Sequence, residues 1–319
     1  MLVIKITSLL ANQMFAYASA KSIALDNGYE FRYMHAHAGI AESRNSSYDK
    51  KFGKDFDTIF DIPESEKVDV LPDSVDKIHS EDPYIKKYDS FYYEDVRYVE
   101  DNTLLLGHYI SPQYFYHRLN DVQEWFKFPK EIDEQVMEEI SFIRKSIGNN
   151  KLISVHFRVG TDYRNYGYLM HENYWLNAGK YMVNIIGKDI TFLVFYDKKT
   201  KAIKKFMKKY NCIVCHGSLV HDMCAMTKCD GHILSNSTFS MMGALLNKNN
   251  PQHVIRPSKY PIGPFSLQKN SFLDVWEVVE SKRNKFAWLC GLLQIGRIRN
   301  KLTNTLGKYI KIQKEKKVL

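Results

Sequence analysis

The second half of the chain alternates short apolar runs with helical patterns, and this alternation limits the fold more than any other feature. Short strands that alternate with helices predict a parallel sheet covered by helices on both faces. Ligands bind at the carboxyl ends of the strands in such sheets. The apolar runs span 152–157, 191–196, 212–215, 232–234 and 253–255, and the helical patterns span 172–186, 199–209, 220–228 and 239–246.

The first half opens with a strand–helix–strand unit, in which the turn signal Asn27-Gly28 precedes the second strand. Residues 48–90 mix Asp, Lys and Pro without periodicity, and they predict loops and short helices. The last helix of this half is expected to bridge the two halves. The patterns predict strands at 2–7, 29–34 and 104–106 and helices at 11–26 and 132–147.

Size and composition indicate a globular protein of about two domains, because 45% of its 319 residues are hydrophobic and 25% are charged. The segment from Glu280 to Leu319 contains 11 Lys/Arg and 2 Glu, a net charge of +9 that equals the net charge of the whole chain. Basicity confined to a tail argues against nucleic acid as the partner. No signal peptide or run of 18 apolar residues is visible, so we expect a cytoplasmic protein with reduced cysteines.

Two polar segments follow strands of the predicted parallel sheet: 156–163 and 235–240. Because carboxyl ends of parallel strands share one edge, we expect both segments to line one crevice. Arg158 is suited to a diphosphate, since its guanidinium forms bidentate bonds and keeps its charge; the alternative is a salt bridge to Asp162 or Asp197. His156 is either a phosphate ligand or a buried core histidine. The hydroxyls of the second segment suit a phosphate or sugar, or cap a helix.

Four carboxylates are candidates for the general base that an inverting glycosyl transfer requires. Asp197 ends a strand and Asp222 lies near a helix start, where helix capping is the alternative use of Asp. The residues alone leave the choice open among Asp162, Glu172, Asp197 and Asp222.

Cysteines and histidines are frequent between residues 212 and 232. Structural zinc pairs sit on tight turns, whereas Cys212 and Cys215 fall in a strand pattern and Cys224 and Cys229 on a predicted helix. We therefore interpret the cysteines as buried free thiols. No pair of acidic residues of the DxD type follows a strand, so no metal is expected to chelate a diphosphate. The full set is Cys212, Cys215, His216, His221, Cys224, Cys229 and His232.

Five ordered motifs resemble those of the α-1,2-fucosyltransferases of glycosyltransferase family 11, and the resemblance runs from about residue 2 to 260. The segment Asn-Gln-Met-Phe-Ala-Tyr-Ala near the start of the chain is similar to the family's GNQMFQYA. The segment that begins at Gly107 is similar to GYWQSxKYF. The others are similar to HIRRGDY, FSDD and DMxLMSxCxHxIxxNSSFSWWGA. In this chain the five motifs occupy 12–18, 107–115, 156–163, 195–197 and 222–244.

The resemblance implies a GT-B-like fold of two Rossmann-type domains facing a central cleft. Residues 1–145 would form the acceptor side and residues 146–280 a parallel sheet that binds the nucleotide sugar. It also implies metal-independent, inverting transfer of fucose from GDP-fucose to the 2-hydroxyl of a terminal galactose in a cell-surface glycan, without a cofactor. Implied catalytic residues are Arg158, Asp162 and Asp222; implied donor-binding residues are Asn12, His156, Arg158, Asp197, Asn236, Ser237, Thr238, Phe239 and Ser240.

Three departures from the family pattern concern the donor pocket. The family's glycine turn is replaced by Ser8-Leu9-Leu10-Ala11, the second motif arginine is Val159, and the tryptophan pair after the serine turn is Met241-Met242, which predicts a softer pocket surface. Two alternatives therefore stay open: a transferase that uses another GDP-sugar, and a non-catalytic glycan- or nucleotide-binding protein.

The tail, 281–319, forms a third region. Apolar residues spaced among the lysines and arginines of 286–317 predict a basic amphipathic helix. Such a helix binds anionic membrane surfaces, here the inner face of the plasma membrane, which would suit a lipid-linked acceptor glycan. The alternative is a helix that docks on the protein.

Overall fold

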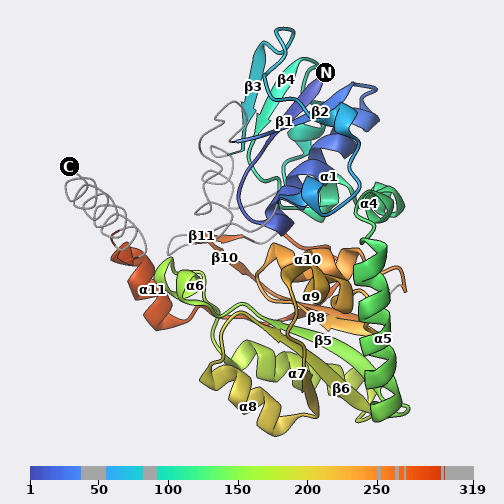
Figure 1. The fold of residues 1–319 in the computed structure, drawn as a ribbon. Helices are drawn as coiled ribbons and strands as arrows, with labels where there is room; N and C mark the ends of the chain where they lie inside the picture. The colour runs from blue at the N-terminus through green and yellow to red at the C-terminus, as the bar shows by residue number, and fades with distance from the viewer. Residues whose placement is uncertain are drawn as a thin grey trace, which may run out of the picture.

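Two parallel sheets, one above the other in Figure 1, organise the computed structural model, which describes residues 1–36, 55–81, 92–249, 253–262, 266–268, 271–295 and 298. The first sheet has four strands in the order β2-β1-β4-β3, and the second has six in the order β12-β9-β8-β5-β6-β7. All pairings within these two sheets are parallel. The predicted α/β, GT-B-like class is confirmed.

The first sheet carries the predicted strand–helix–strand unit. Parallel pairing of β1 with β2 aligns Leu2 with Phe31, and α1 connects the two strands. Helix α1 is buried almost all round, because the sheet covers one side and α10 of the other half covers another. The elements of this half are β1 (Leu2–Ile6), α1 (Leu10–Asp26), β2 (Phe31–His35), β3 (Lys77–Ser80), β4 (Thr103–Leu106) and α4 (Leu119–Trp125).

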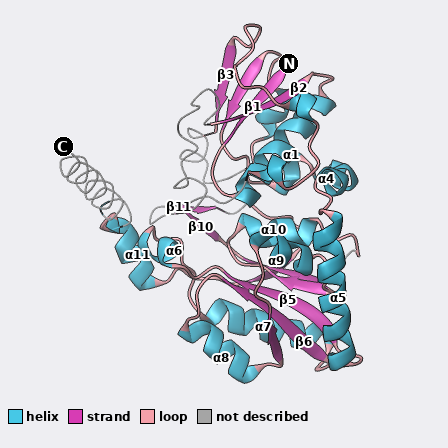
Figure 2. Cartoon of the chain, in the orientation of Figure 1, coloured by secondary structure: helices cyan, strands magenta, loops and turns pink. Residues whose placement is uncertain are grey.

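The second sheet confirms the predicted alternation of strands and helices, with helices on both faces (Figure 2). Its strands are β5 (Lys151–Phe157), β6 (Ile190–Tyr196), β7 (Cys212–Val214), β8 (Gly231–Ile233), β9 (His253–Pro257) and β12 (Glu277–Val279). Its helices are α5 (Lys130–Ile147), α6 (Thr161–Asn165), α7 (Asn173–Ile186), α8 (Lys201–Lys209), α9 (Leu219–Met226) and α10 (Thr238–Leu245).

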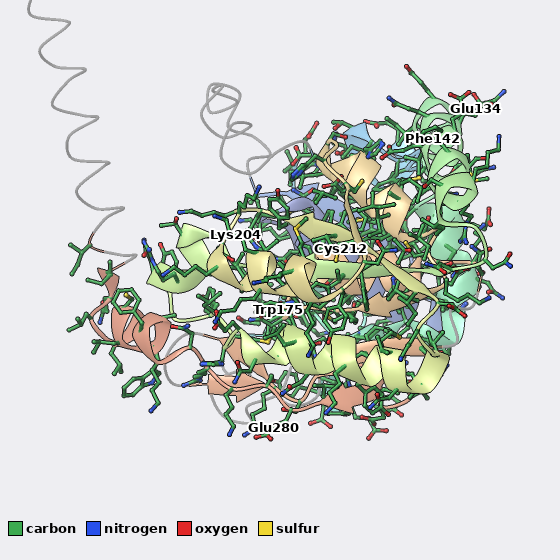
Figure 3. All side chains as sticks on the ribbon, turned by 90° about the horizontal axis from the view of Figure 1, so that it is seen from below. Glu134, Phe142, Trp175, Lys204, Cys212 and Glu280 are labelled. Carbon is green, nitrogen blue, oxygen red and sulfur yellow. The ribbon has the colours of Figure 1, made fainter. Side chains whose placement is uncertain are left out.

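Side chains of β5 alternate between the two faces, as the period of a strand requires. Ile153, Val155 and Phe157 join a core with residues of α7 and α8, whereas Leu152 joins a second core with α5 and α9. Trp175 of α7 lies inside the first core, stacked on the Phe157 ring, while Phe142 projects outward from α5 (Figure 3). This alternation places His156 on the face that carries α9 and α10.

Four strands were missed by sequence analysis: β3 and β12 of the two sheets, and the two strands of a hairpin at 260–262 and 266–268. Strand β3 lies in the segment 48–90, where loops and short helices were predicted, and that prediction is wrong for its residues. Its sequence Lys-Ile-His-Ser is partly exposed and carries no apolar run, and β12 (Glu-Val-Val) is equally short; both are edge strands. The 48–90 prediction for residues 48–54 and 82–90 lies outside the described residues. Short helices do occur there, at η1 (Phe56–Thr58) and η2 (Glu64–Glu66).

Smaller elements complete the described chain. Strands β10 (Tyr260–Ile262) and β11 (Ser266–Gln268) form an antiparallel hairpin, and α11 (Lys285–Leu292) contacts α6. Three short helices flank β4 in the chain: η3 (Glu94–Tyr98) precedes it, and η4 (Pro112–Tyr114) and η5 (Tyr116–Arg118) follow it before α4. The predicted tail helix beyond residue 298 lies outside the described residues. Among the helices that are described, none combines the length and apolarity needed to cross a bilayer.

Helix α10 packs against both halves, whereas α5, which was expected to bridge them, packs in the core of the second half. Helix α5 runs alongside the second sheet and its Val136, Ile140 and Ile143 belong to the core of that half, so packing favours a division of the chain before α5. On the other side, Met241 and Met242 of α10 are fully buried in one core with residues of α1. The methionine pair was predicted to form a pocket surface; the structure places it in the interface between the halves instead. The domain boundaries at 145 and 280 stay predictions.

Candidate functional site

The two polar segments predicted to share a crevice lie side by side, because β5 and β8 are neighbours in the second sheet. His156 Nδ1 lies 2.9 Å from Ser235 Oγ, and Tyr163 donates a hydrogen bond of 2.9 Å from its hydroxyl to the backbone oxygen of Asn236. Side chains of the segment after β5 therefore fix the position of the segment after β8. Strand order, not proximity in sequence, brings them together.

Arg158 follows β5 directly and its guanidinium is enclosed by two carboxylates and one ring. It donates hydrogen bonds to Asp162 and Asp197, and its Cζ atom lies 4.5 Å from the centre of the Tyr163 ring. Burial opposes the charge of Arg158, but Tyr163 and the two carboxylates outweigh it and hold the pKa of Arg158 above its ordinary value. The salt bridge, the alternative interpretation of Arg158, is therefore present in this structure.

Asp197 organises the backbone of the same turn. Its two carboxylate oxygens accept hydrogen bonds of 2.9 and 3.0 Å from the backbone nitrogens of Val159 and Gly160. A Cβ atom at Gly160 would come within 2.6 Å of the Asp197 carboxylate and 2.5 Å of the Asp162 carboxylate, so only glycine fits between them. Asp197 thus acts mainly on the turn that carries Arg158, and its predicted contact with the donor stays a prediction.

His156 is buried, with its ring 5.4 Å from that of Phe239. Burial, assisted by the charge of Arg158, lowers the pKa of His156 to about 3, so the ring is neutral at neutral pH. The structure thus favours the core interpretation of His156, in which the imidazole supports Ser235 beneath the site.

The serine-rich segment caps a helix, which is one of the two uses predicted for it; binding of a phosphate or sugar stays a prediction. Ser237 is the N-cap of α10 and its hydroxyl accepts a hydrogen bond from the backbone nitrogen of Phe239, while the Ser240 hydroxyl donates one to the Ser237 carbonyl. Asn236 behaves differently: its amide nitrogen donates to the Tyr168 carbonyl, but its buried Oδ1 has no hydrogen-bond partner among the described residues. A buried unpaired oxygen is costly, so Asn236 is the residue of this segment that most requires a ligand.

Asn12 joins the two halves directly. Its Oδ1 accepts a 2.7 Å hydrogen bond from Thr238 Oγ1 of α10, and its Nδ2 donates one of 3.0 Å to Ser8 Oγ. Ser8 has a φ of 74°, a left-handed conformation that favours glycine. A serine in a left-handed conformation therefore stands where the family's glycine turn begins, and its hydroxyl accepts a hydrogen bond from Asn12.

The four candidate bases are separated by the structure. Asp162 is beside Arg158 with half of its side chain exposed (51%), whereas Glu172 forms an ion pair with Lys205. Asp222 accepts a 2.8 Å hydrogen bond from the backbone nitrogen of Gly217 and lies near Cys215 and His221. No described contact joins Asp222 to Arg158, so its predicted catalytic role has no support from its neighbours.

Three further residues belong to the site although sequence reasoning did not single them out. Tyr163 and Ser235 lie within or beside the family-like motifs, and this position could have identified them. No sequence pattern identified Lys198, which follows Asp197 and whose Nζ lies 3.2 Å from Thr161 Oγ1. It brings a second positive charge to the turn in which Val159, buried in the core, replaces the family's second arginine.

A groove of about 1050 Å³ lies elsewhere, between α5 and the ends of α4, α9 and α10, and none of the predicted site residues lines it. Several cysteines and histidines between 212 and 232 lie apart from one another: Cys224 lies near Asp133, His216 bonds Tyr196, and His232 bonds Ser154 and Asn247. Cys215 and His221, by contrast, lie close together beside Glu139.

The chain is distantly similar to solved structures of fucosyltransferases. It shares 14% identity with the fucosyltransferase NodZ from Bradyrhizobium over 77% of this chain and 92% of that one (TM-score 0.43), and 12% with POFUT1 in complex with GDP-fucose over 82% and 97% (TM-score 0.42). FUT1 of Arabidopsis thaliana in complex with GDP shares 12% over 77% and 68% (TM-score 0.42). Similarities this distant carry no argument about substrate.

No curated protein matches the sequence. The family described as Glycosyl transferase family 11, however, matches residues 67–280, which is two thirds of the chain and includes β5, β8 and both polar segments. The chain belongs to glycosyltransferase family 11.

Proposed function

We propose that this glycosyltransferase moves fucose from GDP-fucose to the 2-hydroxyl of a terminal galactose, with inversion and without a metal ion. The observation that carries the proposal is the meeting of Arg158 with the Ser235–Ser240 turn, bridged by the Tyr163–Asn236 hydrogen bond. The choice of fucose and of the 2-hydroxyl rests on the five motifs that resemble α-1,2-fucosyltransferases.

Arg158 would stabilise the charge that develops on the departing GDP, a role in which a preorganised guanidinium is most effective. A diphosphate would replace Asp162, the more exposed of the two carboxylates that now hold Arg158. Asp197 would remain, because both of its oxygens also accept backbone hydrogen bonds. Lys198 would supply the second positive charge.

Asp162 is the best placed of the four candidates to act as general base. Released from Arg158 by the donor, its carboxylate would take the proton of the galactose 2-hydroxyl as that oxygen attacks C1 of fucose. The bond between C1 and the diphosphate oxygen breaks in the same step, and GDP leaves with the electron pair. Asp162→Asn would then reduce turnover while GDP binding is retained.

The acceptor is proposed to be a galactose-containing glycan, lipid-linked if the tail contacts the inner face of the plasma membrane. No nucleic-acid partner is proposed, since the excess positive charge is confined to that tail.

A direct test incubates the protein with GDP-fucose, other GDP-sugars and UDP-sugars, each with galactosyl acceptors in EDTA, and identifies the linkage of the product. The proposal predicts a fucose on the 2-hydroxyl. Transfer of a different sugar from a GDP donor would move the assignment to another GDP-sugar, and GDP binding without turnover of any donor would identify a binding protein.

A further inference from the structure

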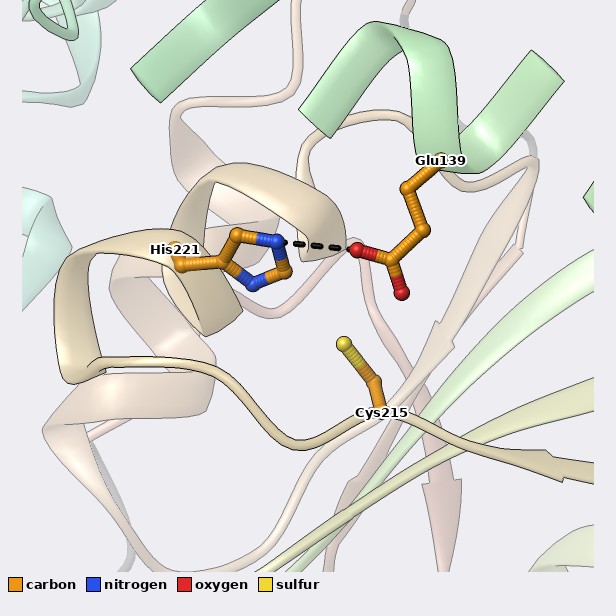
Figure 4. A group of neighbouring side chains, drawn as sticks. All are labelled: Glu139, Cys215 and His221. Carbon is orange, nitrogen blue, oxygen red and sulfur yellow. Dashed lines mark ion pairs between the residues drawn. The ribbon is translucent and has the colours of Figure 1, made fainter. Parts of the chain in front are cut away.

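A cluster of metal-binding side chains lies away from the donor site, at the carboxyl end of edge strand β7. It consists of Glu139 from α5, Cys215 just after β7 and His221 from α9, as Figure 4 shows. One ligand atom from each residue lies within 4.8 Å of the others. Thiolate, imidazole and carboxylate are the side chains that bind zinc in proteins.

The hydrogen bonds of His221 are incomplete without a cation. Its Nε2 lies 2.9 Å from Glu139 Oε2, whereas its buried Nδ1 has no hydrogen-bond partner among the residues that the structure describes and lies 3.7 Å from Asp222 Oδ1. A neutral imidazole has a single N–H, so it cannot donate to both carboxylates. A metal ion on Nε2 would leave that proton on Nδ1, facing Asp222, and a carboxylate behind the ligating histidine is a recurrent arrangement.

The loop before α9 is shaped around this ring. A Cβ atom at Gly217 would come within 2.2 Å of His221 Nδ1, so the imidazole lies directly against the glycine backbone. Asp222 Oδ1, which Gly217 holds through its backbone nitrogen, is also 3.7 Å from Cys215 Sγ. One carboxylate therefore adjoins two of the three ligands and can orient them.

The charge balance of the cluster also favours a cation. The carboxylates of Glu139 and Asp222 both lie beside His221, and a cation would offset their negative charge. The thiol proton of Cys215 would leave to solvent as the metal–sulfur bond forms. Glu139, with 41% of its side chain exposed, provides access from solvent.

We propose that Glu139, Cys215 and His221 bind one Zn²⁺ ion, with Asp222 as the positioning partner of His221. The ion would tie α5 to the β7–α9 loop and would leave a fourth coordination position for water. Zinc bonds of about 2.0 to 2.3 Å place tetrahedral ligands roughly 3.5 Å apart, so no two ligand atoms, now within 4.8 Å, must approach by more than about 1.3 Å. This site is structural and independent of the proposed transfer reaction.

The test uses the full-length protein, stripped with a chelator and dialysed against Zn²⁺ or Co²⁺. We expect one Zn²⁺ per chain, a raised thermal midpoint and, with Co²⁺, the charge-transfer absorption of a cobalt–thiolate bond. Cys215→Ser should abolish that absorption and weaken Zn²⁺ binding at least tenfold, and Asp222→Asn should weaken it about 10- to 100-fold.

Cys212→Ser is the matched control, because Cys212 is a free thiol of the same strand outside the cluster. It should retain stoichiometry, absorption and thermal shift. The proposal is overturned if the stripped protein takes up no Zn²⁺, if Cys215→Ser retains full affinity, or if Cys212→Ser loses it. Loss of sugar transfer by Cys215→Ser, with Zn²⁺ binding intact, would contradict it equally.

Discussion

The turns after β1 and after β5 both depart from the family pattern, but in different ways. The β1 turn has lost its glycines, yet Ser8 keeps a left-handed φ and Asn12 uses both of its polar atoms within the protein. The β5 turn keeps Arg158, Gly160 and Asp162, and sets them among exposed carboxylates and a tyrosine ring. The first turn connects the two halves through Asn12, while the second keeps the residues that are proposed to bind the donor and to carry the reaction.

The largest expected difference between the turns concerns sugar transfer. Arg158→Ala should lower kcat by about 10² to 10³, as expected for the loss of a charge partner of the leaving group. Asn12→Ala should change it less than about tenfold, because Asn12 is already satisfied by Thr238 and Ser8. Steady-state rates with GDP-fucose measure both, and equal losses from the two variants would refute the distinction.

Unfolding at acid pH provides the next difference between the turns, because a buried histidine, His156, lies directly before the β5 turn. Burial lowers the pKa of His156 and of His232 to about 3, so unfolding binds protons below about pH 6.5. Each histidine should therefore cost up to about 1.4 kcal/mol of unfolding free energy per pH unit as the pH falls from 6.5 towards 3. Urea unfolding at pH 6.5 and 5 measures this. His156→Asn should show a shallower loss; an unchanged slope would contradict the burial argument.

The hydrogen bond between Asn12 and Thr238 should be measurable as a coupling free energy. Asn12→Ala and Thr238→Val each remove the hydrogen bond between the halves, and a double-mutant cycle should give about 1 kcal/mol of interaction. Chemical denaturation of the four proteins provides the cycle. Strict additivity would mean that the 2.7 Å contact contributes nothing to the native state.

The smallest expected effect is the backbone strain at Ser8. Ser8→Gly and Ser8→Ala both remove the hydroxyl that Asn12 contacts, and they differ in their tolerance of a φ of 74°. The glycine variant should be the more stable of the two, by about 1 kcal/mol. A more stable alanine variant would show that this turn is not strained.

The sequence was sufficient to predict elements that have a strong apolar period. The prediction included every strand of the six-stranded sheet except β12. The proximity of His156 and Ser235 followed from the expected order of the strands. Edge strands β3 and β12 could not be found, because short, half-exposed strands carry no clear alternation.

Contacts that depend on helix orientation were also out of reach. The burial of Met241 against α1, and the meeting of Glu139 with Cys215 and His221, are set by how α10 and α5 pack on their neighbours. For the same reason, the sequence could not separate Asp162, beside Arg158, from Asp222, in the other cluster.

The central claim is that the β5 and β8 turns form the donor site, and GDP binding tests it most directly. Isothermal titration in EDTA should show one GDP bound by the wild type and by Arg32→Ala, a matched control whose arginine pairs with Glu30 at the start of β2. Arg158→Ala should lose GDP affinity by about tenfold or more. Undiminished GDP binding by Arg158→Ala would contradict the account.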